Sequence, residues 1–367
     1  MGQLSRSDSA RALPACVALR AKTPLAGRSI PTDGCEGFSI AEMLIASLIL
    51  GVIAAQVGLV VVSSDRTQSE SARKVEAMDV TRAVIDVISG DARNAGFMVP
   101  RHAAVSAVDG GTAAADRLCV SSVDYFDLPN APGAASALDV RTARFEGARV
   151  SSVVSTTLDI DLASSLDVDG FGGGNDFVPG EGIIIAQSDG APTATFPAKG
   201  IATYCARIES VDVASQRIRL ILPHAVPSGL FVGTANIIAV PAHVYEVDAG
   251  GITRNSGRLS TLVEDLQVEL WVDSSGVPNG KIDGVGEFPI HDLGAMPQTV
   301  RDSARIRRVR ITVVARGAVR EERSGLLFRP AAANRVAGAE DGFSRQTLTA
   351  SLLPRNLLEI GAYGEVP

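Results

Sequence analysis

Aromatic side chains and clustered positive charge are both scarce in this sequence. Aromatic residues make up 4% of the 367 residues, and Trp271 is the single tryptophan. So few rings offer neither a stacking platform for nucleic-acid bases nor an aromatic cleft for sugars. Lysine and arginine form no block that would bind phosphates, and the formal net charge is -7. No nucleic-acid partner is therefore expected.

The motifs of common catalytic and metal sites are missing as well. The sequence contains no G-x-S-x-G, no H-E-x-x-H and no P-loop pattern. None of the four cysteines belongs to a CxxC pair, and no histidine lies at zinc-finger spacing from them. We therefore expect neither an enzyme nor a cofactor. The histidines are scattered along the chain, at His102, His224, His243 and His291.

One apolar segment dominates the hydropathy of the chain. Residues 43–62, MLIASLILGVIAAQVGLVVV, contain no formally charged side chain in twenty positions. At about 1.5 Å per residue this length matches the hydrocarbon core of a bilayer. The run is too long for the apolar part of a cleavable secretory signal, and too apolar on all sides for the core helix of a soluble protein. It predicts a transmembrane helix.

The first 37 residues indicate the orientation of that helix. They carry five basic and three acidic side chains, a net charge of +2. The positive-inside rule keeps such a terminus in the cytoplasm. Everything after Val62 is therefore expected outside the cytoplasm.

The residues just before the apolar run form a distinctive junction. In the sequence GFSIAE, Gly37 and Phe38 precede Glu42, a lone carboxylate at the start of the span. A carboxylate inside a membrane is costly unless it has a partner, and no basic residue lies within two helical turns of Glu42. A cut after Gly37 would give Phe38 a free amino group. Glu42 of one subunit could then pair with that amine on a neighbouring subunit.

This junction and the apolar run that follows resemble the class III leader of type IV pilins and of type II secretion pseudopilins. The resemblance implies that a membrane prepilin peptidase cuts between Gly37 and Phe38 and N-methylates Phe38. It also implies that the helix enters a pilus core, with Glu42 as the assembly contact. The leader departs from the family pattern, because many such leaders are much shorter. The alternative is a plain single-pass anchor in which Glu42 has no role in assembly.

A helical pattern continues beyond the apolar run. No proline interrupts the chain between Pro31 and Pro100. One helix from Phe38 to about Asp91 would span about 80 Å, half membrane anchor and half amphipathic arm. The residues at spacings of three and four that mark one face of this arm are Val75, Met78, Arg82, Ile85 and Ile88.

From residue 100 onward, short β-branched runs alternate with Gly, Pro, Asp and Ser clusters. These patterns are typical of strands joined by short turns, which favour antiparallel pairing. In the run RIRRVRITVVARG, apolar residues alternate with Arg307, Arg308 and Arg310, so these arginines are expected on a solvent-exposed strand face. The other runs are RLCVSSV, VSSVVSTTLDI, GIIIAQ, CARIESV, RIRLIL, NIIAV and DLQVELWV. The predicted class is α+β, with the long helix packed on a mostly antiparallel, sheet-rich head.

Three segments of the mature chain resemble PilW-type minor pilins in particular. They are DARNAGF at the helix exit, GEGIIIAQSDG with the following ARIESVDVASQRIRLIL, and VEDLQVELWVDSSGVPNGKID with the arginine-rich strand. On this resemblance the chain divides into a cleaved leader (1–37), a pilin helix (38–92, with 43–62 in the membrane) and an extracytoplasmic head (93–367).

The PilW resemblance implies a non-enzymatic subunit that primes pilus assembly near the tip. Its expected partners are the prepilin peptidase, other minor pilins, the major pilin and a tip adhesin. It is expected in the bacterial inner membrane, with a cytoplasmic N-terminus and a periplasmic head, and later in the pilus at the cell surface. The alternatives are a J-type pseudopilin of a type II secretion system and an anchored periplasmic hydrolase.

Cys119 and Cys205 would be the cysteines left after cleavage, because Cys16 and Cys35 leave with the leader. Both lie in strand-like runs, and the expected compartment is oxidising. They either form a disulfide or lie apart as two buried thiols, since the distance between them is a property of the fold.

Two acidic, glycine-rich stretches carry the hard oxygen ligands that calcium prefers. Neither stretch fits the twelve-residue calcium loop, so hairpin turns are favoured over metal sites. The weak calcium candidates are Asp167, Asp169, Asp176, Asp273 and Asp283.

Overall fold

The computed structural model contains one long helix followed by a β-rich head. The residues it describes are 38–97, 99–122, 146–154, 156–162, 166, 175–188, 200–222, 237–274, 282, 289–292, 303–320 and 327–357. The chain divides into two compact units, Met1–Ser63 and Ser64–Pro367. The helix α1, Ile40–Asn94, runs through this boundary without interruption for 55 residues.

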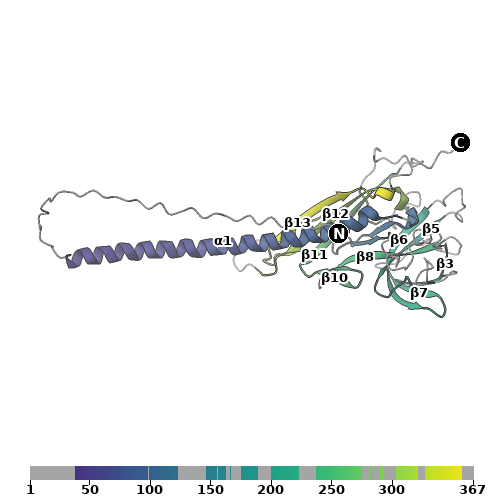
Figure 1. Ribbon diagram of the computed structural model, residues 1–367, viewed down its shortest axis with the longest axis horizontal. Coiled ribbons are helices and arrows are strands. Elements are labelled where there is room, and N and C mark those ends of the chain that lie inside the picture. The colour runs from purple at the N-terminus through teal and green to yellow at the C-terminus, as the bar shows by residue number, and fades with distance from the viewer. Residues whose placement is uncertain are drawn as a thin grey trace, which may run out of the picture. The chain divides into compact units, whose positions relative to one another are not determined.

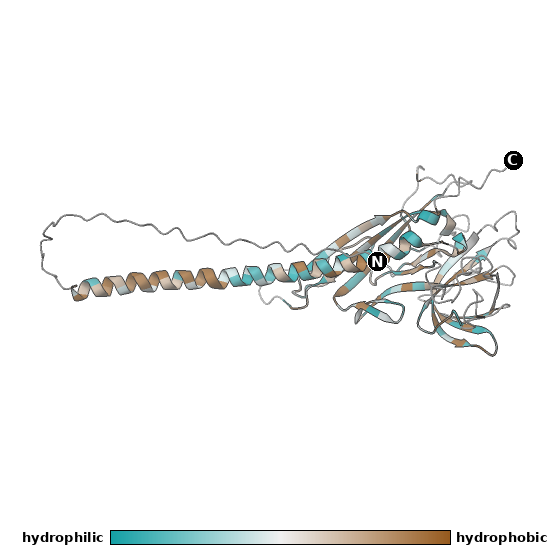
Figure 2. Ribbon diagram, in the orientation of Figure 1, coloured by the Kyte–Doolittle hydropathy of each residue, from teal (hydrophilic) through white to brown (hydrophobic). Residues whose placement is uncertain are grey.

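In the first unit, every described side chain of α1 is exposed. The exposed residues are mainly apolar, and Figure 2 shows this stretch as an almost unbroken hydrophobic band. In the described part of the chain, α1 is the one helix long and apolar enough to cross a membrane. An apolar surface of this size needs cover from lipid or from other protein.

In the second unit, α1 packs one face against the sheets of the head. The buried stripe starts at Ala77 and Thr81, whose hydroxyl donates a hydrogen bond of 2.6 Å to the Ala77 carbonyl oxygen. Val75 and Met78 are exposed, so the predicted face was wrong at its N-terminal end. The helix packs there through small side chains rather than through the larger ones nearby. The rest of the buried stripe is Val84, Ile85, Ile88, Ser89 and Ala92.

Thirteen strands and two short 3₁₀ helices follow α1 in the described residues. Each of the eight strand-like runs of the sequence contains or overlaps a strand. The elements are η1 (Arg101–Ala103), β1 (Val105–Val108), β2 (Arg117–Val120), β3 (Glu146–Val154), β4 (Thr157–Leu162), β5 (Gly182–Ser188), β6 (Gly200–Asp212), β7 (Arg217–Ile221), β8 (Ile237–Asp248), β9 (Gly251–Arg254), β10 (Gly257–Ser260), β11 (Val263–Val272), η5 (Ser303–Arg305), β12 (Ile306–Arg316) and β13 (Arg345–Leu352).

Six of these strands close into an antiparallel barrel. The order is β8-β3-β4-β7-β6-β5, and β5 pairs back onto β8 over Ile237–Ala242. The interior is filled by apolar side chains such as Leu158, Ile160, Ile218 and Leu220. Alternation along β7, with Ile218 and Leu220 buried between exposed residues, follows from the period of two of a strand. The barrel is therefore a packed core.

The strand β8 belongs to the barrel and to a second group of strands. Its first half pairs with β5, whereas His243–Tyr245 pair with β2 and Tyr245–Asp248 pair with β9. A separate antiparallel sheet, β11-β12-β13, lies beside the second half of α1 (Figure 1). One apolar core joins α1, β2, β11 and β12, through residues such as Ile88, Leu118, Val268 and Ile311. The predicted α+β class, a long helix on a mostly antiparallel head, is confirmed.

Arg307 is buried, so its predicted place on the exposed face of β12 was wrong. Trp271 of β11 pairs with Arg308 and Val272 pairs with Ile306, which leaves Arg307 as an extra residue in a bulge. Its side chain is 2% exposed. The guanidinium donates a hydrogen bond of 3.0 Å to the Leu357 carbonyl oxygen and one of 2.7 Å to the Ala304 carbonyl oxygen. Arg308 is exposed, as expected, whereas Arg310 is half-buried and paired with Glu269.

Candidate functional site

The junction before the apolar run forms the N-terminal cap of α1. The Ser39 hydroxyl accepts a hydrogen bond of 3.2 Å from the backbone N–H of Glu42. In return, the Glu42 carboxylate accepts one of 3.0 Å from the backbone N–H of Ser39. This reciprocal pair is a capping box, and the negative charge also lies favourably at the positive end of the helix dipole.

Glu42 therefore has a partner within its own chain, which the sequence argument missed. The partner is a backbone N–H group rather than a basic side chain. The spacing S-x-x-E before an apolar run, here Ser39 to Glu42, is the signal that predicts it.

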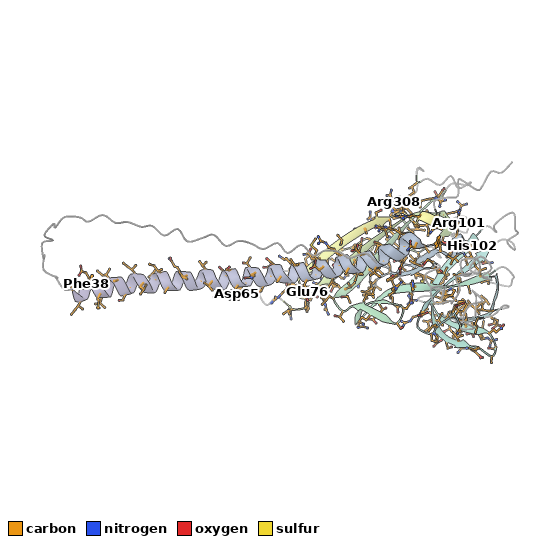
Figure 3. All side chains as sticks on the ribbon, in the orientation of Figure 1. Phe38, Asp65, Glu76, Arg101, His102 and Arg308 are labelled. Atoms are coloured by element: carbon orange, nitrogen blue, oxygen red, sulfur yellow. A yellow bond between two sulfur atoms is a disulfide. The ribbon has the colours of Figure 1, made fainter. Side chains whose placement is uncertain are left out.

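Phe38 lies immediately before this cap and is 86% exposed. Figure 3 shows the side chains of α1 standing out from all its faces between Phe38 and Asp65. Glu42 is the one charged side chain from Phe38 to Ser64. Gly37 lies outside the described residues.

Replacing Ser39 by alanine is expected to destabilise the start of α1 by about 1 kcal/mol, because the backbone N–H of Glu42 loses its side-chain acceptor. Amide hydrogen exchange of the full chain in detergent measures this. Exchange should become faster over the first helical turn and stay unchanged beyond residue 64. Ser47→Ala is the matched control, because the Ser47 hydroxyl binds the Leu44 carbonyl oxygen inside the helix. Equal exchange in both variants would show that the cap is not formed.

At its other end, α1 is fastened to the head through Asp91. The Asp91 carboxylate accepts hydrogen bonds from the Tyr245 hydroxyl and, at 3.0 Å, from Nε of Arg254. Burial, and secondly the charge of Asp91, raise the pKa of Tyr245, so its hydroxyl stays protonated and keeps donating at physiological pH. The second half of α1 is therefore bound to β8 and β9 by one shared carboxylate.

The chain turns away from α1 at Gly96, two residues after the helix ends. Gly96 has a φ of 78°, which favours glycine, and a side chain there would press against Ala104 and Leu357. Nδ2 of Asn356 donates a hydrogen bond of 3.1 Å to the carbonyl oxygen of Asn94, the last residue of the helix. Residues near the C-terminus thus cover the end of α1.

Replacing Tyr245 by phenylalanine is expected to lower the free energy of unfolding of the head by about 1 kcal/mol, because Asp91 loses one donor. Arg254 continues to pair with Asp91, so the loss should be partial. Urea unfolding followed by circular dichroism measures it. An unchanged midpoint for Tyr245→Phe, together with a lower one for Asp91→Asn, would mean that the ion pair alone fastens the helix.

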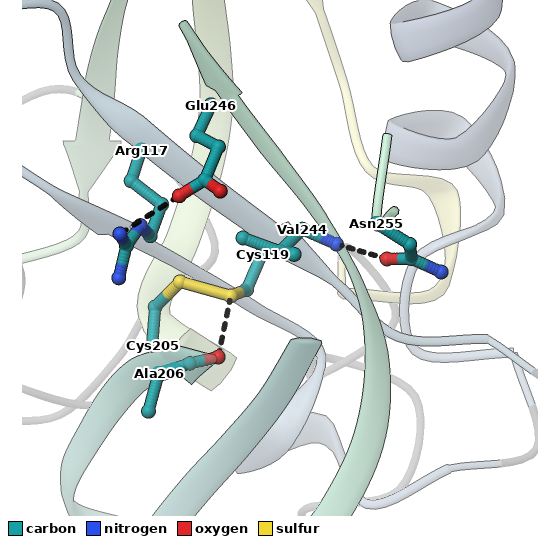
Figure 4. Close-up of a disulfide and its surroundings, with 7 residues drawn as sticks. All are labelled: Arg117, Cys119, Cys205, Ala206, Val244, Glu246 and Asn255. Atoms are coloured by element: carbon teal, nitrogen blue, oxygen red, sulfur yellow. Dashed lines mark hydrogen bonds and ion pairs between the residues drawn. A yellow bond between two sulfur atoms is a disulfide. The ribbon is translucent and has the colours of Figure 1, made fainter. Parts of the chain in front are cut away.

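Cys119 and Cys205 form a disulfide between β2 and β6. Their Cα atoms are 5.6 Å apart and 86 residues apart in sequence. Both side chains are fully buried. Figure 4 shows Arg117 and Glu246 next to this bridge, joined to each other by an ion pair of 2.8 Å.

The chain has little detectable similarity to known proteins. No family model and no curated protein sequence matches the chain. Among solved structures, a type IV-like pilin from Thermus thermophilus is similar, with 13% sequence identity and a TM-score of 0.20. The similarity covers 49% of this chain and 86% of that one. A likeness at this level supports neither a fold nor a function by itself.

The calcium candidates fall in two groups. Asp167, Asp169 and Asp283 lie outside the described residues, and Asp176 and Asp273 lie within them. Asp273 is fully buried, and its carboxylate lies 3.8 Å from the Arg307 guanidinium. Among the residues that the structure describes, no three His, Cys, Asp or Glu side chains are grouped so as to hold a metal ion.

One buried acid–base pair joins the loop before β2 to β11. The Asp116 carboxylate accepts a hydrogen bond of 2.7 Å from the Val268 backbone N–H. Nδ1 of His291 lies 3.8 Å from the same carboxylate. Burial raises the pKa of Asp116, and the contact with Asp116 raises the pKa of His291. His291 also approaches the Val268 carbonyl oxygen at 3.0 Å, so the pair serves to cross-link backbone segments.

Proposed function

We propose that the chain is the precursor of a minor pilin of a type IV pilus. Prepilin peptidase cuts it between Gly37 and Phe38 and methylates the new amine of Phe38. Residues 43–62 anchor it in the inner membrane, with the head in the periplasm. The observation that supports this most is the wholly exposed apolar part of α1, which directly follows the sequence GFSIAE.

The chemistry of the junction agrees with a subunit that changes partners. In the isolated chain, Glu42 is held by its own backbone cap with Ser39. The amine that cleavage creates at Phe38 of a neighbouring subunit is a positively charged donor, so a bond to it adds the attraction between two opposite charges to what the backbone N–H offers Glu42. The exposed apolar surface of α1 exchanges lipid for the helices of neighbours as the subunit leaves the membrane.

Within the type IV pilus, we assign the chain a PilW-type role, initiating assembly near the tip with other minor pilins, the major pilin and a tip adhesin. The support is the DARNAGF helix exit and the two β-segments that resemble that group. A J-type pseudopilin of a type II secretion system has the same kind of anchor and is the second candidate. An anchored hydrolase would need a nucleophile and a base converging in a pocket.

Sheared surface filaments test the proposal. The chain should be found in filaments from wild-type cells and be at least about tenfold depleted when Glu42 is replaced by alanine, since the variant loses a buried charge pair. Asp248→Asn is the matched control, because Asp248 pairs with Arg258 on the exposed head. Equal filament content in both variants would contradict the role of Glu42. Loss of secreted proteins with intact pili in a deletion strain would favour the pseudopilin.

A further inference from the structure

Two side-chain links join β2 to β6 next to each other. The first is the disulfide between Cys119 and Cys205. The second runs through Glu246 of β8, which binds Arg117 of β2 at 2.8 Å and also binds Arg207 of β6. No sheet ladder pairs β2 with β6 in the described part of the chain. The backbone connects them indirectly, since β2 pairs with β8, β8 with β5 and β5 with β6. The two links described above join β2 to β6 directly through side chains.

The spacing of these residues places both links on the same strand faces. Arg117 and Cys119 lie two residues apart on β2, and Cys205 and Arg207 lie two residues apart on β6. Side chains at i and i+2 of a strand point to the same side. The carboxylate of Glu246 and the disulfide thus form successive bridges across one gap. Figure 4 shows the disulfide and the Arg117–Glu246 half of the other bridge.

Glu246 determines whether this gap is electrostatically attractive or repulsive. Arg117 and Arg207 carry like charges, and one carboxylate lies between them. The side chains are partly shielded, with exposed fractions of 17% for Arg117, 15% for Glu246 and 35% for Arg207. Such partial burial reduces solvent screening, so the ion pairs are stronger than those at an open surface. Without Glu246, the two guanidinium groups would repel each other where the cysteines must meet.

We propose that Glu246 is a positioning residue for formation of the Cys119–Cys205 disulfide. In this step the two thiols lose two electrons and two protons, one S–S bond forms, and the S–S bond of a disulfide oxidant is reduced to two thiols. Both cysteines are buried in the folded head, so their effective concentration toward each other depends on how closely β2 and β6 are held.

Thermodynamic linkage relates the stability of the disulfide to that of the Glu246 ion pairs. The factor by which the ion pairs of Glu246 favour the disulfide equals the factor by which the disulfide favours those ion pairs. The inference rests on the head alone and is independent of the proposed pilin function, since it concerns no residue of α1.

The redox equilibrium of the full chain in detergent tests the proposal. The protein is equilibrated in glutathione buffers of increasing ratio of oxidised to reduced form, and free thiols are then alkylated. Peptide mass spectrometry gives the fraction of Cys119 joined to Cys205. We expect Glu246→Gln to lower the effective concentration of the pair about tenfold. Glu264→Gln is the matched control, because Glu264 binds Arg345 instead. It should leave the half-oxidation ratio unchanged, which is the ratio of oxidised to reduced glutathione at which half of the protein carries the disulfide.

A second variant keeps the test decisive if Glu246→Gln fails to fold. Arg207→Gln removes one arginine, while Glu246 still pairs with Arg117. It should lower the effective concentration in the same direction, though less. The proposal would be overturned by a half-oxidation ratio that is unchanged in Arg207→Gln, or that shifts as far in Glu264→Gln as in Glu246→Gln.

Discussion

Replacing both Cys119 and Cys205 by alanine is expected to lower the free energy of unfolding of the head by about 4 kcal/mol. The two cysteines lie 86 residues apart, and a cross-link that closes so long a loop strongly restricts the unfolded chain. The loop includes β3, β4 and β5, so half of the six barrel strands lie between the linked residues. A loss of this size is comparable to the whole stability of a marginal domain.

Urea unfolding of the full mature chain in detergent measures this effect, with Trp271 of β11 as the single fluorescent tryptophan. Wild-type protein with a reduced disulfide is the control for the change of side chain, and it should unfold near the midpoint of the double variant. A double variant within about 1 kcal/mol of the oxidised wild type would contradict a stabilising role of the bridge.

Replacing Arg307 by methionine is expected to lower the free energy of unfolding by about 3 kcal/mol or more. The change removes the Arg307 guanidinium from beside the buried Asp273 carboxylate and leaves the carbonyl oxygen of Leu357 without this donor. Because that donor ties residues after β13 to the bulge in β12, the C-terminal part of the described chain should loosen first.

Arg308 supplies a matched control for Arg307, one position further along the same strand. It is exposed, and its guanidinium lies 5.6 Å from the centre of the Trp271 ring. Arg308→Met should cost about 1 kcal/mol or less, since it removes one solvent-exposed cation–π contact. Equal losses in the two variants, measured by the same urea unfolding, would mean that the bulge does not bury Arg307.

Much of the fold follows from local patterns that the sequence displays. The helix α1 was expected from Phe38 to about Asp91 and runs from Ile40 to Asn94, because apolar length, absence of proline and periodicity all act within the segment. The strands were predictable for the same reason. Their closure into a barrel was not, because the pairing of β5 with β8 joins residues fifty or more positions apart, and local periodicity contains no register between distant strands.

The candidate site divides in the same way. The capping box of Ser39 and Glu42 is predictable from the S-x-x-E spacing, because both of its hydrogen bonds are local. The burial of Arg307 was not, because strict alternation fails at a bulge, and the bulge is set by pairing with β11. The distance between Cys119 and Cys205 likewise depends on how β2 meets the barrel, which no local pattern determines.

The mature N-terminus of the chain tests the central proposal most directly. Mass spectrometry would compare the protein from cells with and without their prepilin peptidase. The proposal predicts N-methyl-Phe38 as the first residue when the peptidase is present, and residues 1–37 still attached when it is absent. Residues 1–37 retained in peptidase-competent cells, or a cut beyond Val62, would contradict the pilin assignment and leave a head carried by a plain membrane anchor.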